Sequence, residues 1–399
     1  MEKIKQMLLE KIKLLATKNF ETILGYRRHI HENPELSYHE NNTADYISSV
    51  LKEYGIPYSR MANTGVIGII KGKQPGKTIA LRADIDALPI EEKNEVSYKS
   101  KNIGVMHACG HDVHTASLLG AAKILSELSN EWNGTIKLIF QPGEEKLPGG
   151  ASILIKEGVL ENPAPLSIIA QHVFPSLETG KVGFAEGSYM AACDEVYLTV
   201  KGKGGHAALS KATINPLLIT SEILLKLEST FMRNTDNASP LVMAFGKMTA
   251  NGATNVIPNE VYLEGTLRTM DEDKRKEAHT TIKEIISSIA KNWGGDYDLR
   301  IEKGYPVLVN NEELTRRAKK FAEEYLGKDN VVTLEPRMTS EDFAYYSRVK
   351  PSCFYRLGTA NASKGITAGV HTPTFNIDEK ALETGMGLMA WIAINELKG

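Results

Sequence analysis

Residues 135–145 read TIKLIFQPGEE, an apolar run of strand-forming residues that ends in a Pro-Gly turn and two adjacent glutamates. Residues 78–82 and 167–171 are similar apolar runs, and helical patterns such as residues 114–128 separate them. Strands that alternate with helices indicate a parallel arrangement with helices packed on the faces of the sheet. The sequence therefore predicts an α/β fold with a mostly parallel sheet covered by helices.

Acidic or imidazole side chains directly follow each of these three runs. Asp84 and Asp86 follow the first, Glu144 and Glu145 end the second, and His172 comes directly after the third. In open α/β sheets, ligands bind beyond the carboxyl ends of the strands. We therefore expect these side chains to lie together at one edge of the sheet.

The pattern changes near residue 190, which indicates a second domain. Strand-like and helical stretches follow in the order β-α-β-β-α-β, which is typical of a ferredoxin-like fold; they are residues 195–201, 216–229, 241–247, 261–268, 273–292 and 297–302. Helices and strands then resume, and the chain ends in a long helical pattern. The sequence predicts a discontinuous catalytic domain, residues 1–190 and 305–399, with an inserted ferredoxin-like α+β domain, residues 191–304.

Composition excludes several classes of function. The 399 residues include 47 Lys and Arg and 49 Asp and Glu, so the formal net charge is −2, whereas nucleic-acid-binding proteins usually carry a clustered basic excess. Three scattered cysteines do not make a disulfide framework, and no stretch approaches the ~18–20 apolar residues of a membrane span. We expect a soluble cytoplasmic protein, with no nucleic-acid or membrane partner.

Residues 106–114 read MHACGHDVH and lie just before a predicted helix. Cys109 and His111 flank Gly110, which lets the backbone bend between them. Thiolate, imidazole and carboxylate groups are ligands suited to zinc or a similar transition ion. The tripeptide alone fits a buried cysteine beside a capping histidine equally well. It indicates a metal site only in combination with the paired glutamates and His172.

Glu144 and Glu145 suit different roles, because adjacent residues of an extended segment project to opposite sides. One can bind a metal ion while the other faces the water that the ion polarises and takes its proton. The alternative is a solvated acidic pair on a surface loop. A Pro-Gly turn directly after a buried strand disfavours that alternative.

These motifs together resemble the aminoacylase and carboxypeptidase metallopeptidase family. The resemblance is to its amidohydrolase branch, which includes hippurate hydrolases, N-acyl-L-amino-acid amidohydrolases and indole-acetyl-amino-acid hydrolases. It covers nearly the whole chain. The matching segments, in order, are RRHIHENPE (27–35), LRADIDALP (81–89), HACGHDVH (107–114), QPGEE (141–145), KGKGGHAA (201–208), NVIP (255–258), GTLR (265–268) and SEDF (340–343).

The resemblance implies two divalent metal ions, bound by Cys109, His111, Glu145, His172 and His371. It makes Glu144 the general base, and later the acid that protonates the leaving amine. Cys109 stands where more distant relatives have an aspartate, so it is a candidate to bridge the two ions, with Glu145 as its rival. Zinc is the first expectation for the metal, and manganese, cobalt or nickel are alternatives. Asp84 and Asp86 are candidates to orient a metal-binding imidazole.

The resemblance also gives the inserted domain a role as a lid or dimerisation domain. It implies that His206 stabilises the oxyanion, from the partner subunit in dimeric relatives, and that Asn255 and Arg268 hold the substrate's carboxylate. We therefore expect a homodimer or a homotetramer. The chain departs from close relatives at residues 209–211, which read LSK instead of Met-Pro-His. That departure leaves the substrate preference open.

The predicted function is hydrolysis of the amide bond of N-acyl-amino acids to a carboxylic acid and an amino acid. A dipeptidase or carboxypeptidase would use the same chemistry on a different small substrate. Two other classes are an amidase with Cys109 as nucleophile and a binding protein with a structural zinc. The remaining histidines are predicted to have structural roles: His29, His31 and His39 pack or cap, His107 supports the metal loop, His114 starts its helix, and His279 is exposed.

Overall fold

The computed structural model describes residues 2–232 and 240–398, and the chain divides into two compact units. Unit 1 comprises Met1–Gly187, Val309–Glu335 and Tyr345–Gly399, and unit 2 comprises Ser188–Leu308 and Pro336–Ala344. Their assignment as a catalytic domain and a lid or dimerisation domain stays a prediction. Within the described ranges, no helix combines the length and apolar character that a membrane span requires.

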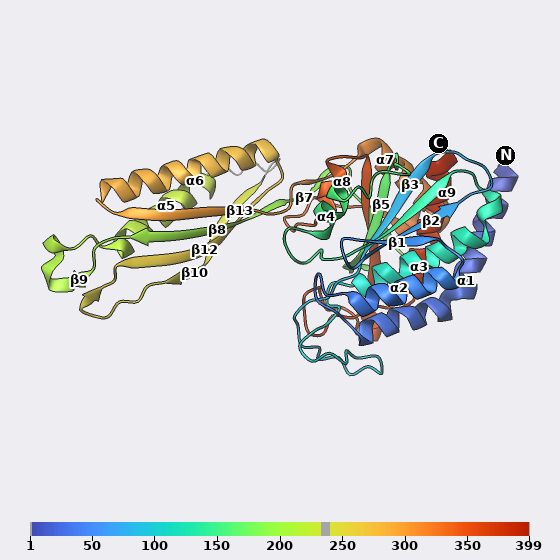
Figure 1. The fold of residues 1–399 in the computed structure, drawn as a ribbon, viewed down its shortest axis with the longest axis horizontal. Helices are drawn as coiled ribbons and strands as arrows, with labels where there is room; N and C mark the ends of the chain where they lie inside the picture. Colours follow the sequence, from blue (N-terminus) through green and yellow to red (C-terminus); the bar gives the residue numbers. More distant parts are fainter. Residues whose placement is uncertain (1, 233–239, 399) are drawn as a thin grey trace. The chain divides into compact units, whose positions relative to one another are not determined.

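Unit 1 contains a sheet of eight strands in the order β1-β2-β4-β3-β5-β16-β6-β15. Figure 1 labels β1, β2, β3 and β5 of this sheet. The neighbouring strands β4, β3, β5 and β16 run parallel to one another, which confirms the predicted α/β class with a mostly parallel sheet. The strands are β1 (Tyr58–Met61), β2 (Gly65–Lys71), β3 (Thr78–Asp84), β4 (Thr135–Gln141), β5 (Ile168–Glu178), β6 (Val182–Phe184), β15 (Val331–Thr333) and β16 (Ser352–Ala360).

The register of the sheet brings the ends of three strands to one edge. Asp84 and Gln141 are paired, and each is the last residue of its strand. Arg82 pairs with Ala170, so His172 lies level with this edge. His172 lies inside β5 instead of after it, because β16 continues to pair with β5 beyond this residue. The strand prediction was therefore too short at this point, although the edge was predicted correctly.

Helices α1, α3, α7 and α9 form most of the apolar core of unit 1 together with the sheet. α9 is buried around almost its whole circumference, because α1, α3, α7 and the sheet all contact it. The helices of this part of the chain are α1 (Glu2–Glu32), α2 (Asn41–Glu53), α3 (His111–Glu127), α4 (Gly150–Lys156), α7 (Glu312–Leu326), α8 (Ala344–Ser347) and α9 (Ala381–Lys398), with short 3-10 helices at Ser129–Glu131, Lys328–Asn330 and Ala362–Lys364.

Unit 2 has a four-stranded antiparallel sheet in the order β10-β12-β8-β13, with α5 and α6 packed on it. β8 alternates buried and more exposed residues, because only one face of the sheet meets the helices. The order β8-α5-β10-β12-α6-β13 confirms the ferredoxin-like prediction. Its elements are β8 (Ala192–Lys201), α5 (Pro216–Met232), β10 (Leu241–Thr249), β12 (Glu260–Thr269), α6 (Glu272–Asn292) and β13 (Asp296–Lys303).

Two small ribbons complete the described strands. β9 (Gly205–His206) pairs with β11 (Val256–Ile257), next to a 3-10 helix at Ala207–Ala212. β7 (Gly187–Met190) pairs with β14 (Leu308–Asn310) where the chain passes between the two units.

Candidate metal centre

The Cys-x-His turn requires its central glycine. Gly110 has a φ of 85°, in the left-handed region, and α3 begins directly after it at His111. A Cβ atom at Gly110 would lie 2.6 Å from a methyl carbon of Val173, the residue that follows His172. The glycine therefore lets the turn pack closely against the end of β5, and the helix begins three residues earlier than the sequence pattern predicted.

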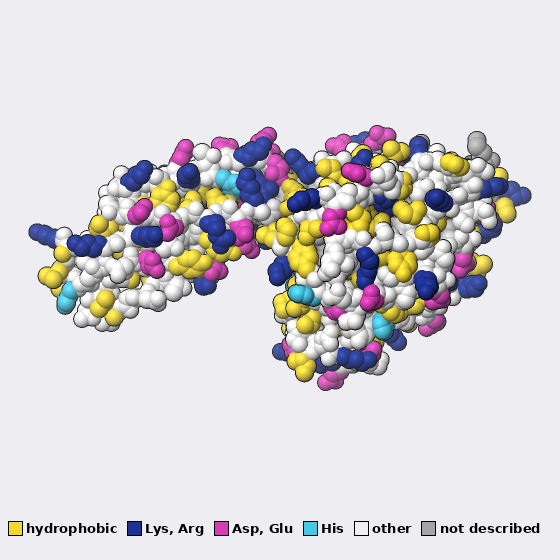
Figure 2. Space-filling model, viewed as in Figure 1, with side chains coloured by type: hydrophobic (Ala, Val, Ile, Leu, Met, Phe, Trp, Pro, Cys, Tyr) yellow, Lys and Arg dark blue, Asp and Glu magenta, His cyan; other side chains and the backbone are white. Residues whose placement is uncertain are grey.

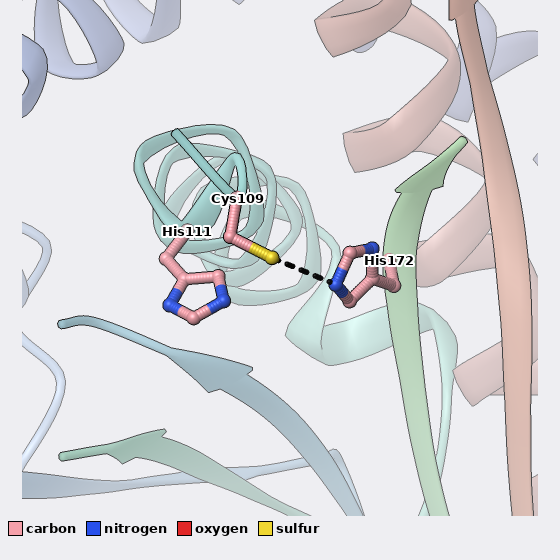
Figure 3. Close-up of side chains that lie close together, drawn as sticks. All are labelled: Cys109, His111 and His172. Carbon is pink, nitrogen blue, oxygen red and sulfur yellow. Dashed lines mark hydrogen bonds between the residues drawn. The ribbon is translucent and has the colours of Figure 1, made fainter. Parts of the chain in front are cut away.

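The Cys109 thiol lies close to two imidazole rings. Its Sγ is 3.5 Å from Nε2 of His172, the contact that Figure 3 shows. The same Sγ is 3.3 Å from Nε2 of His371. His172 donates from Nδ1 to the carbonyl oxygen of Val173 at 2.8 Å, so its Nε2 is the nitrogen that faces the thiol with a lone pair. This tautomer is the one that a metal-binding histidine needs.

Asp86 fixes the ring of His111. The Nδ1 of His111 lies 2.9 Å from the backbone oxygen of Asp86 and 3.2 Å from its Oδ1. The opposite nitrogen, Nε2, is buried and has no hydrogen-bond partner among the described residues. It lies 3.8–3.9 Å from carboxylate oxygens of Asp84, Glu144 and Glu145. A buried imidazole nitrogen that faces several carboxylates is the arrangement expected around a bound cation.

His371 approaches the same place from a distant part of the sequence. It has a φ of 61°, and its backbone N–H donates to the oxygen of Ala108 at 2.7 Å. Its Nε2 lies 3.2 Å from Oε1 of Glu145 as well as close to Cys109. A non-glycine residue in the left-handed region costs conformational energy. The contact with the Ala108 peptide holds the imidazole beside the thiol in spite of this cost.

Five of the predicted residues form overlapping groups of potential metal ligands. Within each group the ligand atoms lie within 4.8 Å of one another. Cys109 belongs to two such groups, one with His111 and His172 and one with Glu145 and His371. Thiolate, imidazole and carboxylate donors suit a transition ion. The orphaned Nε2 of His111 fits the same role. The chemistry and spacing of these residues therefore fit bound divalent cations.

The electrostatics of the site also favour bound cations. Burial raises the pKa of the Cys109 thiol, and the charges of Glu145 and Glu144 raise it further, to well above its usual range. Burial would lower the pKa of His111, but Asp84 and Asp86 outweigh it and raise that pKa to about 10. The protein alone thus disfavours a thiolate and favours an extra positive charge here. A divalent cation supplies positive charge and stabilises the thiolate.

His114 has a role that the sequence did not reveal. It was predicted to start its helix, but it lies inside α3 and bridges two strands. Its Nδ1 lies 2.5 Å from Oδ1 of Asp84, and its Nε2 accepts from the backbone N–H of Val173 at 2.9 Å. Asp84 therefore contacts His114, and His114 binds the backbone N–H of Val173, the residue after His172. Asp86 contacts His111 instead. The sequence could not indicate these contacts, because they depend on how β3, α3 and β5 pack together.

Asp112, the residue directly after His111, belongs to a buried ion network. Asp112 accepts from Nε of Arg27 at 2.8 Å, and its Oδ2 lies 2.8 Å from Nδ1 of His31. The Nε2 of His31 in turn faces Glu92 at 3.2 Å. His31 therefore joins an ion network, where the sequence predicted packing or capping. His107 is also buried, and both its ring nitrogens have no hydrogen-bond partner among the described residues.

Unit 2 carries the remaining predicted residues. His206 pairs with Val256 in the small ribbon, and the backbone N–H of Ala207 donates to the oxygen of Asn255, the residue before β11, at 3.0 Å. Arg268 lies in β12 instead and donates to Oγ of Ser340 at 2.7 Å. The structure thus brings two of the three together.

One histidine of unit 2 differs from its prediction. His279 is only partly exposed, because its Nε2 lies 2.6 Å from a carboxylate oxygen of the buried Asp194. The same carboxylate is paired with Arg275. The charged pattern of its helix predicted full exposure, but the helix face that holds His279 turns toward β8.

A family model and known relatives match most of this chain. The model of Peptidase family M20/M25/M40 matches residues 80–395. The N-acyl-L-amino acid amidohydrolase of Geobacillus stearothermophilus is 40% identical over 308 residues, which cover 77% of this chain and 83% of that protein. Thermostable carboxypeptidase 2 of Saccharolobus solfataricus is 37% identical over 391 residues, which cover 97% of this chain and 98% of that protein.

A solved structure from the same family also matches this chain. The YXEP protein of Bacillus subtilis, a dinuclear metal-binding peptidase from the M20 family, superposes with a TM-score of 0.83 at 34% identity, and the match covers 96% of this chain and 99% of that one. The resemblance seen in the sequence motifs is thereby confirmed. The chain is a hydrolytic enzyme that acts on amides, and it belongs to Peptidase family M20/M25/M40.

Proposed function

We propose that this chain hydrolyses the amide bond of N-acyl-amino acids at a site that holds two divalent metal ions. The observation that carries the proposal is the pair of ligand groups that share the Cys109 thiol, with Glu144 beside them. Relatives at 37–40% identity named as an N-acyl-L-amino acid amidohydrolase and a carboxypeptidase support the reaction class, and the dinuclear peptidase supports the number of ions.

In this proposal, Cys109 would belong to both groups of ligands. His111 and His172 would complete one group, and Glu145 and His371 would complete the other. Bound divalent cations would supply Lewis-acid chemistry, polarising a water molecule and the amide carbonyl. Zinc is the first candidate, because thiolate and imidazole donors favour it over harder cations. Manganese, cobalt and nickel are the alternatives.

Glu144 is the proposed general base. Its carboxylate is nearly buried, and its Oε2 lies 3.9 Å from Nε2 of His111, so it borders the ligand groups. In the first step Glu144 takes a proton from the attacking water. In the second it gives that proton to the nitrogen of the leaving amine, so that the carboxylate is regenerated at the end of the cycle.

His206 is the proposed oxyanion donor. Its Nδ1 accepts from the backbone N–H of Ala208 at 3.2 Å, so a neutral ring carries its proton on Nε2. Such an N–H can donate to the oxygen of a tetrahedral intermediate. Asn255 and Arg268 are the proposed contacts of the substrate's carboxylate, since an amide and a guanidinium both offer N–H donors. A dimer that supplies His206 from the partner subunit is part of the proposal.

The alternative with Cys109 as nucleophile is disfavoured by the protonation of the thiol. The thiolate is the reactive form of cysteine, and burial together with two glutamates raises the pKa of Cys109 well above its usual range. A purely structural zinc site is disfavoured too. Closed zinc sites use four ligands with none to spare, whereas a nearly buried carboxylate, Glu144, borders these groups.

A matched pair of variants tests the proposal. We expect Glu144→Gln to keep its metal content and to lower kcat by about 10²- to 10⁴-fold, while Glu145→Gln loses metal. Metal content is measured by elemental analysis, and turnover is measured on N-acetyl and N-benzoyl amino acids. Dipeptides in the same panel distinguish the peptidase alternative. Turnover that persists in Glu144→Gln would remove Glu144 from the mechanism.

A further inference from the structure

The segment that follows α1 contacts the loop that carries Glu144. It includes residues 36–40, of which Leu36 forms a bridge with Ala87, beyond the end of β3. The first of its polar contacts is made by Ser37, whose Oγ donates to Oδ2 of Asp86 at 2.6 Å. The same oxygen of Asp86 accepts from the backbone N–H of Glu145 at 2.9 Å. Ser37 thus stabilises the Asp86 carboxylate, which in turn binds the backbone N–H of Glu145.

Tyr38 makes a second set of contacts with the loop. Its hydroxyl donates to the backbone oxygen of Lys146 at 2.7 Å and accepts from the backbone N–H of Gly149 at 3.0 Å. It therefore contacts both ends of the turn at residues 146–149, in which the backbone N–H of Gly149 also donates to the oxygen of Lys146 at 3.0 Å. Its ring also packs against Gly143, where a Cβ atom would overlap the aromatic carbons. Tyr38 has a φ of 68°, so its backbone adopts a conformation that L-residues disfavour in order to make these contacts.

Glu40 makes the third contact. Its carboxylate is fully buried, and Oε1 accepts from the backbone N–H of Gly143 at 2.8 Å. Its Oε2 accepts from Oγ1 of Thr64 at 2.6 Å, so both carboxylate oxygens are used. Gly143 is the residue directly before Glu144, and its own oxygen accepts from the backbone N–H of Gly150 at 3.0 Å.

These bonds fix the peptide groups on both sides of Glu144. The peptide before it is held through the oxygen of Gly143, and the peptide after it through the N–H of Glu145. Glu40 holds the next peptide in the N-terminal direction. With both flanking peptides fixed, the backbone dihedrals of Glu144 are fixed too. The direction in which its Cα–Cβ bond projects is then set by the protein before any substrate binds.

We propose that Tyr38 and Glu40 are positioning residues for Glu144, so that this segment orients the general base. The inference rests on the proposed function of Glu144 as that base. Neither residue is assigned to bind metal or substrate; each acts through the backbone of the loop. Preorganisation of this kind matters because a displacement of about 1 Å in a reacting group can cost about 10²-fold in rate.

The test compares Glu40→Ala with Glu40→Gln and with a control at Glu35. We expect Glu40→Ala to lower kcat by about 10- to 100-fold, with KM changed by less than about threefold because no substrate contact is removed. Glu40→Gln keeps an oxygen that can accept from Gly143 and should recover most of kcat. Tyr38→Phe is the milder second variant, which removes only the hydroxyl and should lower kcat while the protein folds normally.

Glu35 provides the matched control. Its carboxylate lies five residues earlier and accepts from the backbone N–H of Thr43 at 2.8 Å, so it fastens α2 instead of the loop. Glu35→Ala should lower the thermal midpoint, as Glu40→Ala does, but should leave kcat within about twofold of the starting protein. A loss of kcat that simply follows the loss of stability in all variants would overturn the proposal.

A double variant separates this inference from the function on which it rests. In a Glu144→Gln background, Glu40→Ala should cause no further loss of turnover, because the base that it positions is absent. If Glu40→Ala lowers the residual rate by the same factor, its role is merely structural. If Glu144→Gln itself retains turnover, the proposed function fails. If Glu144→Gln is inactive while Glu40→Ala and Tyr38→Phe are fully active, only the positioning role fails.

Discussion

Replacing Arg27 by methionine should destabilise unit 1 strongly. Arg27 is fully buried, and its guanidinium pairs with Asp112 at 2.8 Å and with Glu379 at 3.1 Å. In the variant, Glu379 still has an ion pair with Arg28, at 2.6 Å. Asp112 retains only His31, and its Oδ1 already has no hydrogen-bond partner among the described residues. The substitution therefore leaves a buried carboxylate with one cation instead of two.

The expected cost is about 3–5 kcal/mol in the free energy of unfolding, the range for removing one partner of a buried ion pair. Urea unfolding followed by tryptophan fluorescence measures it, since Trp132 and Trp391 are buried in the core of unit 1. With a denaturant slope of about 3 kcal/mol per molar, the midpoint should fall by at least about 1 M.

The double variant Arg27→Met with Asp112→Asn provides the control. It removes both charges and leaves groups of similar size, so most of the lost stability should return. A single variant within about 1 kcal/mol of the starting protein, or a double variant less stable than the single one, would refute the reasoning.

The same variant should show a defined dependence on pH. Burial would raise the pKa of Asp112, but Arg27 and His31 outweigh it and hold that pKa well below its usual range. A carboxyl group with a lowered pKa contributes stability that is present above its unfolded pKa of about 3.9 and is lost as the pH falls. Without Arg27 the pKa rises. The difference in stability between the two proteins should therefore be larger at pH 7 than well below the unfolded pKa of about 3.9, and an unchanged difference would argue against Asp112 as its source.

Other parts of the site give further expectations. Gly143→Ala should lower both stability and kcat, because the added Cβ would overlap the ring of Tyr38 at a φ of 58°; thermal melting and turnover measure this, and full activity would contradict the packing. Chelation at neutral pH should abolish turnover and lower the thermal midpoint, since loss of a ligand present at about 1,000 times its Kd costs about 4 kcal/mol. Zinc, manganese, cobalt and nickel, added back separately, identify the metal that restores both, and turnover that resists chelation would count against the metal centre.

The arrangement of strands was open to prediction because hydrophobic patterns are local. The apolar run at residues 135–141 and its Pro-Gly turn indicate a strand end whether or not the rest of the chain is known. The alternation of helices and strands then indicates a mostly parallel sheet, and parallel strands share one edge for their carboxyl ends. This logic is sufficient to predict Glu144, Glu145 and His172 as neighbours.

Other features depend on contacts between distant residues. His371 is 262 residues from Cys109 in the sequence, and its imidazole reaches the thiol through a backbone contact with Ala108. Local reasoning gave no reason to choose it, and only the family resemblance did. Arg27 and Asp112 are separated by 85 residues, and neither residue type indicates a buried partner.

The strand at residues 135–141 and the two glutamates that follow it show what a local sequence pattern can predict and what it cannot. The sequence alone determined that an acidic pair follows a buried strand, because apolar periodicity and turn chemistry act over a few residues. The tertiary structure decided how the backbone that carries both glutamates is held, because the loop is fixed by Ser37, Tyr38 and Glu40 from a segment some hundred residues away. Such bonds depend on the register of the sheet and on chain packing, which no local pattern encodes.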